Sequence, residues 1–206
     1  MPLYVIFVLH GLFIATFVLR WAASRRGATG RQGFADSTAE GPARVGAAPH
    51  ASTDVVLHLA AWGLLYVTSG LTLAQIRPDP WLVRTPLFPR QPLVGAVVML
   101  LGDSLLVWTM LVFGSWRLLA RIDPMHHLAT TGPFGLVRHP NYLAMLLVAL
   151  GTFLWVPTPW VLGALVAVVA VSERRARAEE RLLAEAFGER YRAYRRRVRR
   201  WIPGLY

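Results

Sequence analysis

The side chains able to do acid–base or binding chemistry gather in two short stretches of the sequence. The first runs from Asp123 to Tyr142 and reads DPMHHLATTGPFGLVRHPNY. The second runs from Glu173 to Tyr194 and reads ERRARAEERLLAEAFGERYRAY. Together they offer histidine, glutamate and arginine, which can move protons, bind cationic groups and hold carboxylates.

Composition excludes several other kinds of site. The chain has no cysteine, and its 22 basic residues, against 11 acidic ones, are all arginine. A thiolate nucleophile, a zinc–cysteine centre and a lysine Schiff base are therefore excluded. No GxGxxG, Walker A, HExxH or GxSxG pattern occurs, so Rossmann, P-loop, zincin and α/β-hydrolase folds have no support. Adjacent His126 and His127 are poorly spaced for one helix face, so no metal is expected.

Apolar runs define the elements that must position these stretches. Of the 206 residues, 55% are hydrophobic, which is too apolar for an ordinary soluble domain. A helix crosses a membrane with about 20 apolar residues. The runs are Leu3–Trp21, Val55–Ile76, Leu93–Val112, Tyr142–Trp155 and Trp160–Val171. They predict an all-α integral membrane protein with about five membrane-embedded helices, of which the last two form a hairpin.

The runs also predict how the chain is organised. Residues 1–112 should hold three transmembrane helices, with a flexible loop at 22–53 that is rich in Gly, Ala and Ser. Residues 113–206 should hold the catalytic region. Its last helix meets no breaker before Gly188 and is expected to leave the membrane and form a cytoplasmic cap with the Gly114–Pro140 loop.

Arginine placement predicts the orientation in the membrane. The net charge of +11 comes from arginines between the apolar runs and in the tract Arg190–Arg200, a pattern that fits lipid headgroups better than nucleic acid. Fewer arginines flank the opposite side, namely Arg77, Arg84 and Arg90. We therefore expect a multi-pass protein with its N-terminus outside, and with the active site and C-terminus in the cytoplasm.

The second polar stretch has a helical period. Four residues recur at intervals of four and share one drifting face, namely Arg175, Glu179, Leu183 and Phe187. Arg175 and Glu179 should therefore point toward the protein. Without this stripe, Glu179 and Glu180 would be solvated helix residues paired with Arg175 and Arg177, and Glu180 gains less from the stripe.

One ionisable residue falls inside a predicted span. Asp103 lies near the middle of the third apolar run, where a charged side chain is a functional candidate by default. It belongs to no motif. We expect it either to contact a substrate or to make a buried hydrogen bond, for example to His10 or His58.

The order and spacing of the polar motifs resemble the isoprenylcysteine carboxyl methyltransferase family, over roughly residues 113–203. The resemblance is carried by Gly132-Pro133-Phe134, Arg138-His139-Pro140-Asn141-Tyr142, the apolar hairpin, Glu179-Glu180, Phe187-Gly188 and Tyr191. Phospholipid N-methyltransferases share the RHPxY and paired-glutamate elements. The resemblance therefore specifies a fold and a cofactor, and leaves the acceptor open.

The resemblance implies S-adenosyl-L-methionine as cofactor and Arg175 as a catalytic, substrate-binding residue on the acceptor side. The cofactor contacts that it implies are His126, His127, Leu128, Ala129, Phe134, His139, Pro140, Asn141, Tyr142 and Glu179. The chain departs from the family at Phe134, where a tyrosine is usual, at Ala129, and at Ala144 after the motif. His126 and His127 are also the catalytic candidates for general base if the acceptor needs deprotonation.

The residue types agree with this cofactor on chemical grounds. A sulfonium nucleoside with an amino-acid tail needs an anion for its ammonium, a donor for its carboxylate and apolar faces for its adenine. Glu179, His139 and Phe134 supply these types. An acceptor carboxylate, as in a prenylated cysteine, is already ionised and needs no base, whereas a lipid phenol or amine would need deprotonation. The resemblance favours O-methylation over N-methylation.

Two other functions stay open on the sequence alone. A sterol-reductase-type enzyme that uses NADPH carries a similar Pro-Asn-Tyr element, although Arg138-His139 and the paired glutamates argue against it. A non-catalytic membrane binding protein of the same fold is the second. In every case the partners are the lipid bilayer and a lipophilic molecule, with no nucleic acid.

Overall fold

The computed structural model describes residues 4–25, 46–74, 89–112, 121–122 and 128–202. Within these ranges it contains six helices: α1 (Tyr4–Arg25), α2 (Ala51–Leu73), α3 (Gln91–Val112), α4 (Pro133–Leu136), α5 (Pro140–Trp155) and α6 (Pro159–Arg197). The predicted all-α fold is confirmed. A minimal antiparallel sheet, which was not predicted, pairs β1 (Gly46–Ala47) with β2 (Arg121–Ile122).

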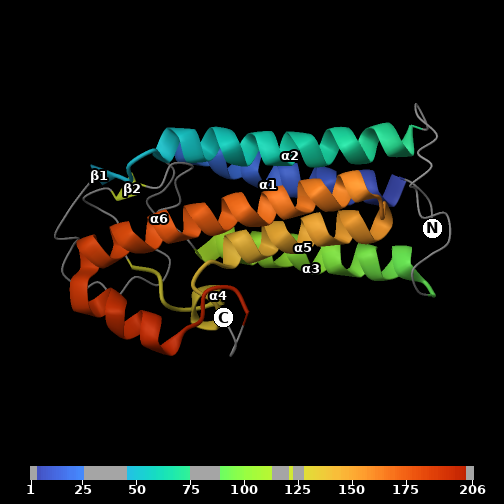
Figure 1. The fold of residues 1–206 in the computed structure, drawn as a ribbon. Coiled ribbons are helices and arrows are strands. Elements are labelled where there is room, and N and C mark those ends of the chain that lie inside the picture. The colour runs from blue at the N-terminus through green and yellow to red at the C-terminus, as the bar shows by residue number, and fades with distance from the viewer. Residues whose placement is uncertain (1–3, 26–45, 75–88, 113–120, 123–127, 203–206) are drawn as a thin grey trace.

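Prolines set the starts of the three C-terminal helices. Pro133, Pro140 and Pro159 stand in the first turns of α4, α5 and α6, where the missing N–H costs no helical hydrogen bond. Thr158 caps α6, because its side-chain oxygen accepts a hydrogen bond of 3.2 Å from the N–H of Val161. A short turn therefore joins α5 to α6 as an antiparallel hairpin (Figure 1).

Small residues let α3 and α5 pack closely. A Cβ atom on Gly102 of α3 would lie 2.8 Å from the carbonyl oxygen of Ala144 on α5, and one on Gly95 would lie 2.9 Å from that of Gly151. Close approach of helix backbones through glycine and alanine is typical of packing in membranes. In addition, α1 packs against α3, and α2 packs against α6.

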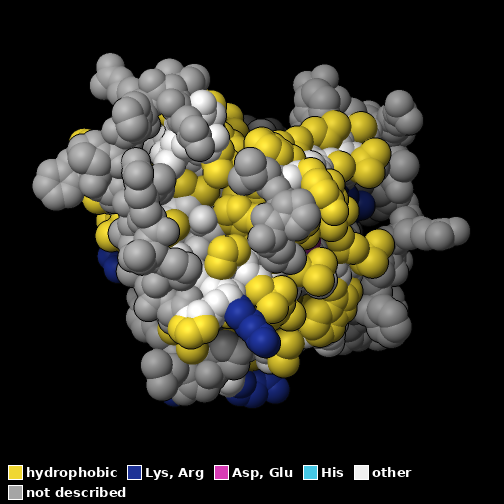
Figure 2. All heavy atoms as spheres, turned by 90° about the vertical axis from the view of Figure 1, so that its right-hand side faces the viewer, with side chains coloured by type: hydrophobic (Ala, Val, Ile, Leu, Met, Phe, Trp, Pro, Cys, Tyr) yellow, Lys and Arg dark blue, Asp and Glu magenta, His cyan; other side chains and the backbone are white. Residues whose placement is uncertain are grey.

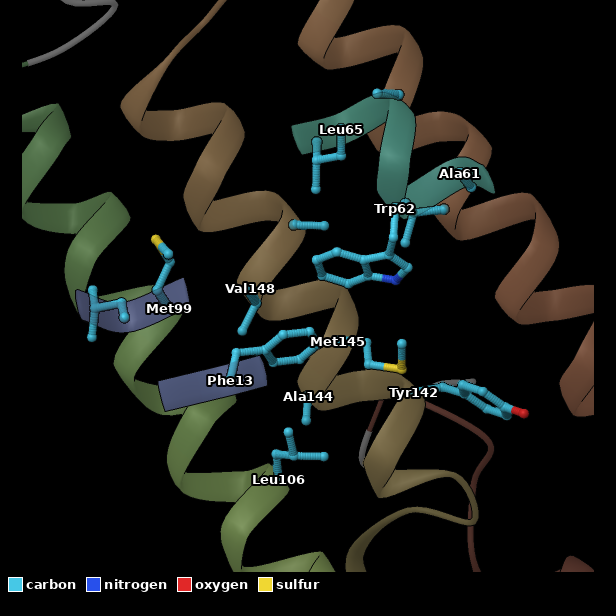
Figure 3. Close-up of a cluster of buried hydrophobic side chains, with 14 of the residues drawn as sticks. Phe13, Ala61, Trp62, Leu65, Met99, Leu106, Tyr142, Ala144, Met145 and Val148 are labelled. Carbon is cyan, nitrogen blue, oxygen red and sulfur yellow. The ribbon is translucent and has the colours of Figure 1, made fainter. Parts of the chain in front are cut away.

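The main hydrophobic core lies inside this bundle. Figure 3 shows part of it, with side chains from four helices that include Phe13, Trp62, Met99, Leu106 and Val148. Tyr142 lies at the edge of the cluster, and its hydroxyl group points away from the other labelled side chains (Figure 3). The bundle thus places the Tyr142 hydroxyl group of α5 at the edge of the apolar core.

Large apolar side chains also cover the outside of the bundle. Exposed fractions reach 62% for Phe7, 60% for Leu59, 78% for Leu111 and 59% for Val166. Figure 2 shows that hydrophobic side chains, in yellow, make up most of the described surface at one end. Among the described helices, α2 and α3 are long and apolar enough to cross a membrane, and α1 and α5 have shorter apolar stretches. A bundle that is apolar inside and outside suits lipid. The count of five spans and the orientation stay predictions.

Helix α6 continues far beyond its apolar half, as the lack of an early breaker predicted. It runs on past the N-terminal end of α5 and then bends back (Figure 1). The bend falls at Gly188, whose φ of +52° lies in the left-handed region that favours glycine. Residues 113–120 and 123–127, on which the predicted cap also depends, lie outside the described part of the chain, so the cap stays a prediction.

Candidate active site

Three side chains meet where α6 passes the first turn of α5. The Tyr142 hydroxyl donates a hydrogen bond of 2.5 Å to Oε1 of Glu179, and Nε of Arg175 donates one of 2.9 Å to the same hydroxyl oxygen. The Arg175 guanidinium also lies 5.7 Å from the centre of the Tyr142 ring. The tyrosine therefore links an anion and a cation that stand one turn apart on α6.

His139 lies between two carboxylates. Its Nδ1 is 3.6 Å from Oε2 of Glu179, and its Nε2 is 3.3 Å from Oε1 of Glu180. Burial alone would lower the pKa of His139, but its hydrogen bonds with both glutamates outweigh burial and raise that pKa. An imidazolium, which has a donor on each nitrogen, can satisfy both contacts at once.

Glu180 is enclosed by cations. Arg138 donates to Oε1 through Nε and Nη2 at 3.0 and 2.8 Å, and Arg200 donates to the carboxylate at 2.9 and 2.7 Å. Burial would raise the Glu180 pKa, but the hydrogen bonds from His139 and Arg200, with the Arg138 charge, hold it well below its usual range. Glu180 is therefore ionised and saturated with donors.

Glu179 is more accessible than its neighbour. Its side chain is 26% exposed, against 6% for Glu180. Burial would raise its pKa, yet the hydrogen bond and charge of His139, together with the Arg175 charge, lower it. Glu179 thus presents an ionised carboxylate that a cationic ligand can reach.

The C-terminal tail holds the RHPxY segment in place. The backbone N–H groups of Arg138 and His139 donate to the carbonyl oxygens of Arg199 and Arg200, at 2.8 and 3.2 Å. The Arg200 side chain is only 12% exposed. The expectation that the whole arginine tract faces lipid headgroups is therefore wrong for Arg200, because its guanidinium pairs with two carboxylates, buried Glu180 and half-buried Glu173.

The other predicted site residues surround this cluster at different depths. Pro140 and Asn141 form the first turn of α5, between His139 and Tyr142. Phe134 is buried, and its carbonyl oxygen accepts a hydrogen bond of 2.7 Å from the Tyr194 hydroxyl. Leu128 and Ala129 are half-buried, and Leu128 packs against a small cluster on the last part of α6, formed by Ala186, Phe187, Tyr191 and Tyr194. His126 and His127 lie outside the described residues, so their roles stay predictions.

The reading of Glu179 and Glu180 as solvated helix residues is wrong. Arg177 pairs with Glu173 at 2.6 Å instead, and both glutamates contact the RHPxY segment. Glu180, which the stripe ranked second, is the more deeply buried of the two. The reason is that Arg138 and Arg200 reach Glu180 from outside its own helix, which no periodicity along α6 can reveal.

Of the two alternatives for Asp103, the buried hydrogen bond is wrong, and contact with a substrate stays a prediction. Asp103 is 1% exposed, and neither carboxylate oxygen has a hydrogen-bond partner in the described ranges. His10 contacts the Thr152 hydroxyl at 3.1 Å, and His58 accepts a hydrogen bond from Trp62, which lies one turn along the same helix. Both histidines are thus engaged by other neighbours.

Several residues of the cluster were missed as functional candidates. Arg138 stands next to His139 in the motif, so its part in the cluster could have been anticipated. Arg200 could not, because only the folding back of the tail brings it to Glu180. Outside the cluster, Asp54 on α2 receives a hydrogen bond of 2.5 Å from Arg174. The sequence did not indicate this pair, because an acidic residue in the first turn of a helix is common there for its own sake.

Fold and site together define a class of protein: an apolar helical bundle with a cluster of charged His, Glu and Arg side chains and a neutral tyrosine at one end. Residues 91–190 match the family model described as phospholipid methyltransferase. An uncharacterized protein of Haemophilus influenzae is 35% identical over 63 residues, which make up 30% of this chain and 98% of that protein. The chain therefore carries a domain of the phospholipid methyltransferase family, which extends from α3 through the cluster residues of α6.

This family indicates an S-adenosylmethionine-dependent methyltransferase with a lipid-type substrate. It includes proteins similar to isoprenylcysteine carboxyl methyltransferases, which agrees with the motifs at His139 and Glu179. Together with the apolar helices, it indicates an integral membrane protein. The match begins at Gln91 and ends at residue 190, so it includes α3 as well as most of the predicted catalytic region.

Proposed function

We propose that this protein transfers a methyl group from S-adenosylmethionine to the carboxylate of a lipophilic acceptor, such as a prenylated cysteine. The observation that carries the proposal is the partly exposed Glu179 carboxylate, joined through Tyr142 to Arg175 at the end of an apolar bundle. One residue suits a cationic cofactor group, and the other suits an anionic acceptor.

The residues present fit the cofactor. Glu179 can hold an ammonium group, and half-buried Leu128 with Phe187 can cover an adenine. The backbone N–H groups of Leu128, Ala129 and Thr130 make no hydrogen bond to the described part of the chain, so they can donate to a carboxylate or to hydroxyls. When bound, the cofactor supplies an electrophilic methyl group on a sulfonium.

The chain's own residues then have three tasks. Arg175 holds the acceptor carboxylate, for which a planar guanidinium offers a fork of two donors. The apolar bundle and the cluster keep water out, so that the two reacting groups are held at about 3 to 3.5 Å in a dry site. A carboxylate acceptor is already ionised, so no general base is required; a phenol or amine would need one, and His126 or His127 is the candidate.

A phospholipid amine is the second candidate acceptor, and the description of the matching family favours it. The two chemistries leave different products. A methyl ester releases methanol in mild base, whereas an N-methyl group does not. The family match favours either of them over an NADPH-dependent reductase.

The test is to incubate the purified protein in lipid vesicles with methyl-labelled S-adenosylmethionine and membrane lipid extracts. We expect label in the lipid fraction, and release of that label as methanol by mild base. Label that resists base would replace the carboxylate by an amine. No label in any lipid would overturn the proposed function and leave the non-catalytic binding protein. The Glu189→Gln variant, with its substitution at an exposed position, is the control for handling.

A further inference from the structure

His58 on α2 borders the cluster from the apolar side of the bundle. Its ring centre is 6.1 Å from that of Tyr142, whose hydroxyl is bonded to Glu179 and Arg175. His58 is 5% exposed. It belongs to none of the motifs of the two polar stretches, and its helix precedes the segment that matches the family.

The protonation of His58 is fixed by a neighbour on the same helix. Nε1 of Trp62 lies 3.2 Å from Nε2 of His58. An indole N–H can only donate, so Nε2 must carry a lone pair. The ring is then neutral and has its proton on Nδ1. Trp62 is therefore a positioning residue that turns the Nδ1 side of His58 into a hydrogen-bond donor.

That donor is buried and unused. Nδ1 of His58 has no hydrogen-bond partner among the described residues. Buried N–H groups are almost always paired in proteins, because an unpaired one loses its bond to water without replacement. A polar atom of a ligand would complete the site.

His10 provides an internal comparison. Its Nε2 lies 3.1 Å from the Thr152 hydroxyl oxygen, and that hydroxyl already donates to the Val148 carbonyl at 2.8 Å. Nε2 of His10 must therefore donate, and its unpaired Nδ1 is an acceptor. Thr152 lies ten residues along α5 from Tyr142, about 15 Å away at 1.5 Å per residue. The unpaired Nδ1 is thus a donor in His58 and an acceptor in His10, and His10 lies farther from the cluster.

We propose that the Nδ1–H of His58 binds an oxygen atom of the methyl acceptor and places it beside Arg175 and Tyr142. The ligand would come from the apolar side, because Tyr142 and Trp62, which both contact His58, belong to the hydrophobic core. It must also bring a lone pair, which a carboxylate oxygen has and an ammonium lacks. This inference rests on the proposed function and gives His58 a part in selecting an oxygen acid as acceptor.

The first measurement does not depend on turnover. In the full-length protein labelled with ¹⁵N-histidine, we expect the His58 signals of a neutral ring protonated on Nδ1. Addition of N-acetyl-S-farnesylcysteine, used as a lipophilic carboxylate probe, should shift the Nδ1 signal. A ring protonated on Nε2, or an Nδ1 signal that the probe leaves unchanged, would overturn the proposal.

The second measurement is steady-state methyl transfer to the same probe. His58→Phe keeps an aromatic ring and removes the donor, so the KM for the probe should rise by about 10- to 100-fold while the Kd for S-adenosylmethionine stays within about twofold. His58→Asn restores an N–H near the position of Nδ1 and should recover most of the loss. His10→Phe is the matched control and should leave KM unchanged.

The two failures are distinguishable. If the wild-type protein methylates no lipid, the proposed function fails, while the probe-induced shift at Nδ1 still decides whether His58 binds a carboxylate. If the wild-type protein is active and His58→Phe keeps the wild-type KM, the proposed function stands and the role of His58 is wrong. An equal rise of KM in His10→Phe would also overturn it, because the effect would then come from packing.

Discussion

Glu179 and Glu180 are adjacent on one helix and do opposite things. Glu180 accepts hydrogen bonds from Arg138 and Arg200, contacts His139, and is almost fully buried. Glu179 shares His139, receives the Tyr142 hydroxyl, and keeps about a quarter of its side chain exposed. The first carboxylate has its charge balanced by the protein, whereas the second retains access for a ligand.

The difference shows how a helix can hold an accessible carboxylate in a fixed position at the end of an apolar bundle. A buried carboxylate with several cationic partners is costly to disturb, because removal of one partner leaves an uncompensated charge. Glu180 thereby locks α6 to the RHPxY segment and to the tail. His139 contacts both glutamates. Because one of its contacts is with the firmly held Glu180, His139 also helps to hold Glu179 and Tyr142 in place.

The largest effect is expected at Glu180, the carboxylate whose charge the protein itself balances. Glu180→Gln leaves Arg138, His139 and Arg200 without their shared anion, so the free energy of unfolding should fall by about 3 to 5 kcal/mol. Denaturant unfolding in detergent measures this fall. Glu189→Gln is the matched control, because Glu189 is 63% exposed and pairs with Arg192 and Arg196 at the surface, and it should leave the free energy of unfolding close to that of the wild type. Equal stability of the two variants would contradict the claim that Glu180 is a buried carboxylate on which its cationic neighbours depend.

The next largest effect is expected at Arg175, which is joined through Tyr142 to the more accessible carboxylate, Glu179. Arg175→Lys keeps the charge but loses the planar fork, so turnover of a carboxylate acceptor should fall by about 10- to 1,000-fold with cofactor affinity nearly constant. Turnover at saturating cofactor and calorimetric affinity separate the two quantities. With a phenol or amine acceptor, the loss should instead be mild. Weakened cofactor binding with intact turnover would show that Arg175 serves the cofactor.

The smallest effect concerns pH and the residue that both glutamates share. The pKa of His139 is higher in the folded protein than its unfolded value of about 6.5, so its contribution to stability is fully present below that pH. It is lost as the pH rises through the folded pKa. The melting temperature should therefore fall as the pH rises above about 6.5 and through the folded-state pKa, and His139→Gln should flatten this dependence. The same fall in both proteins would contradict an imidazolium at His139.

Much of this fold was predictable from the sequence, since apolar runs and prolines mark where α1, α2, α3, α5 and α6 lie. The RHPxY motif and the stripe on α6 also anticipated that His139, Tyr142 and Glu179 come together. The contacts of Glu180 with the tail were not predictable, because Arg200 reaches Glu180 only after the chain bends at Gly188 and folds back. The partners of His10 and His58 depend on helix packing and rotation, which apolar periodicity does not specify for helices that are apolar on all sides.

The most direct test of the account is a calorimetric titration of Glu179→Gln with S-adenosylmethionine, on protein purified in detergent. Loss of the accessible anion should weaken binding by about 1.5 to 3 kcal/mol, or roughly 10- to 150-fold, because one hydrogen bond to a charged group is removed. The melting temperature should stay close to that of the wild type, in contrast to Glu180→Gln. Unchanged affinity in a folded Glu179→Gln variant would contradict the central claim that this carboxylate holds the cofactor.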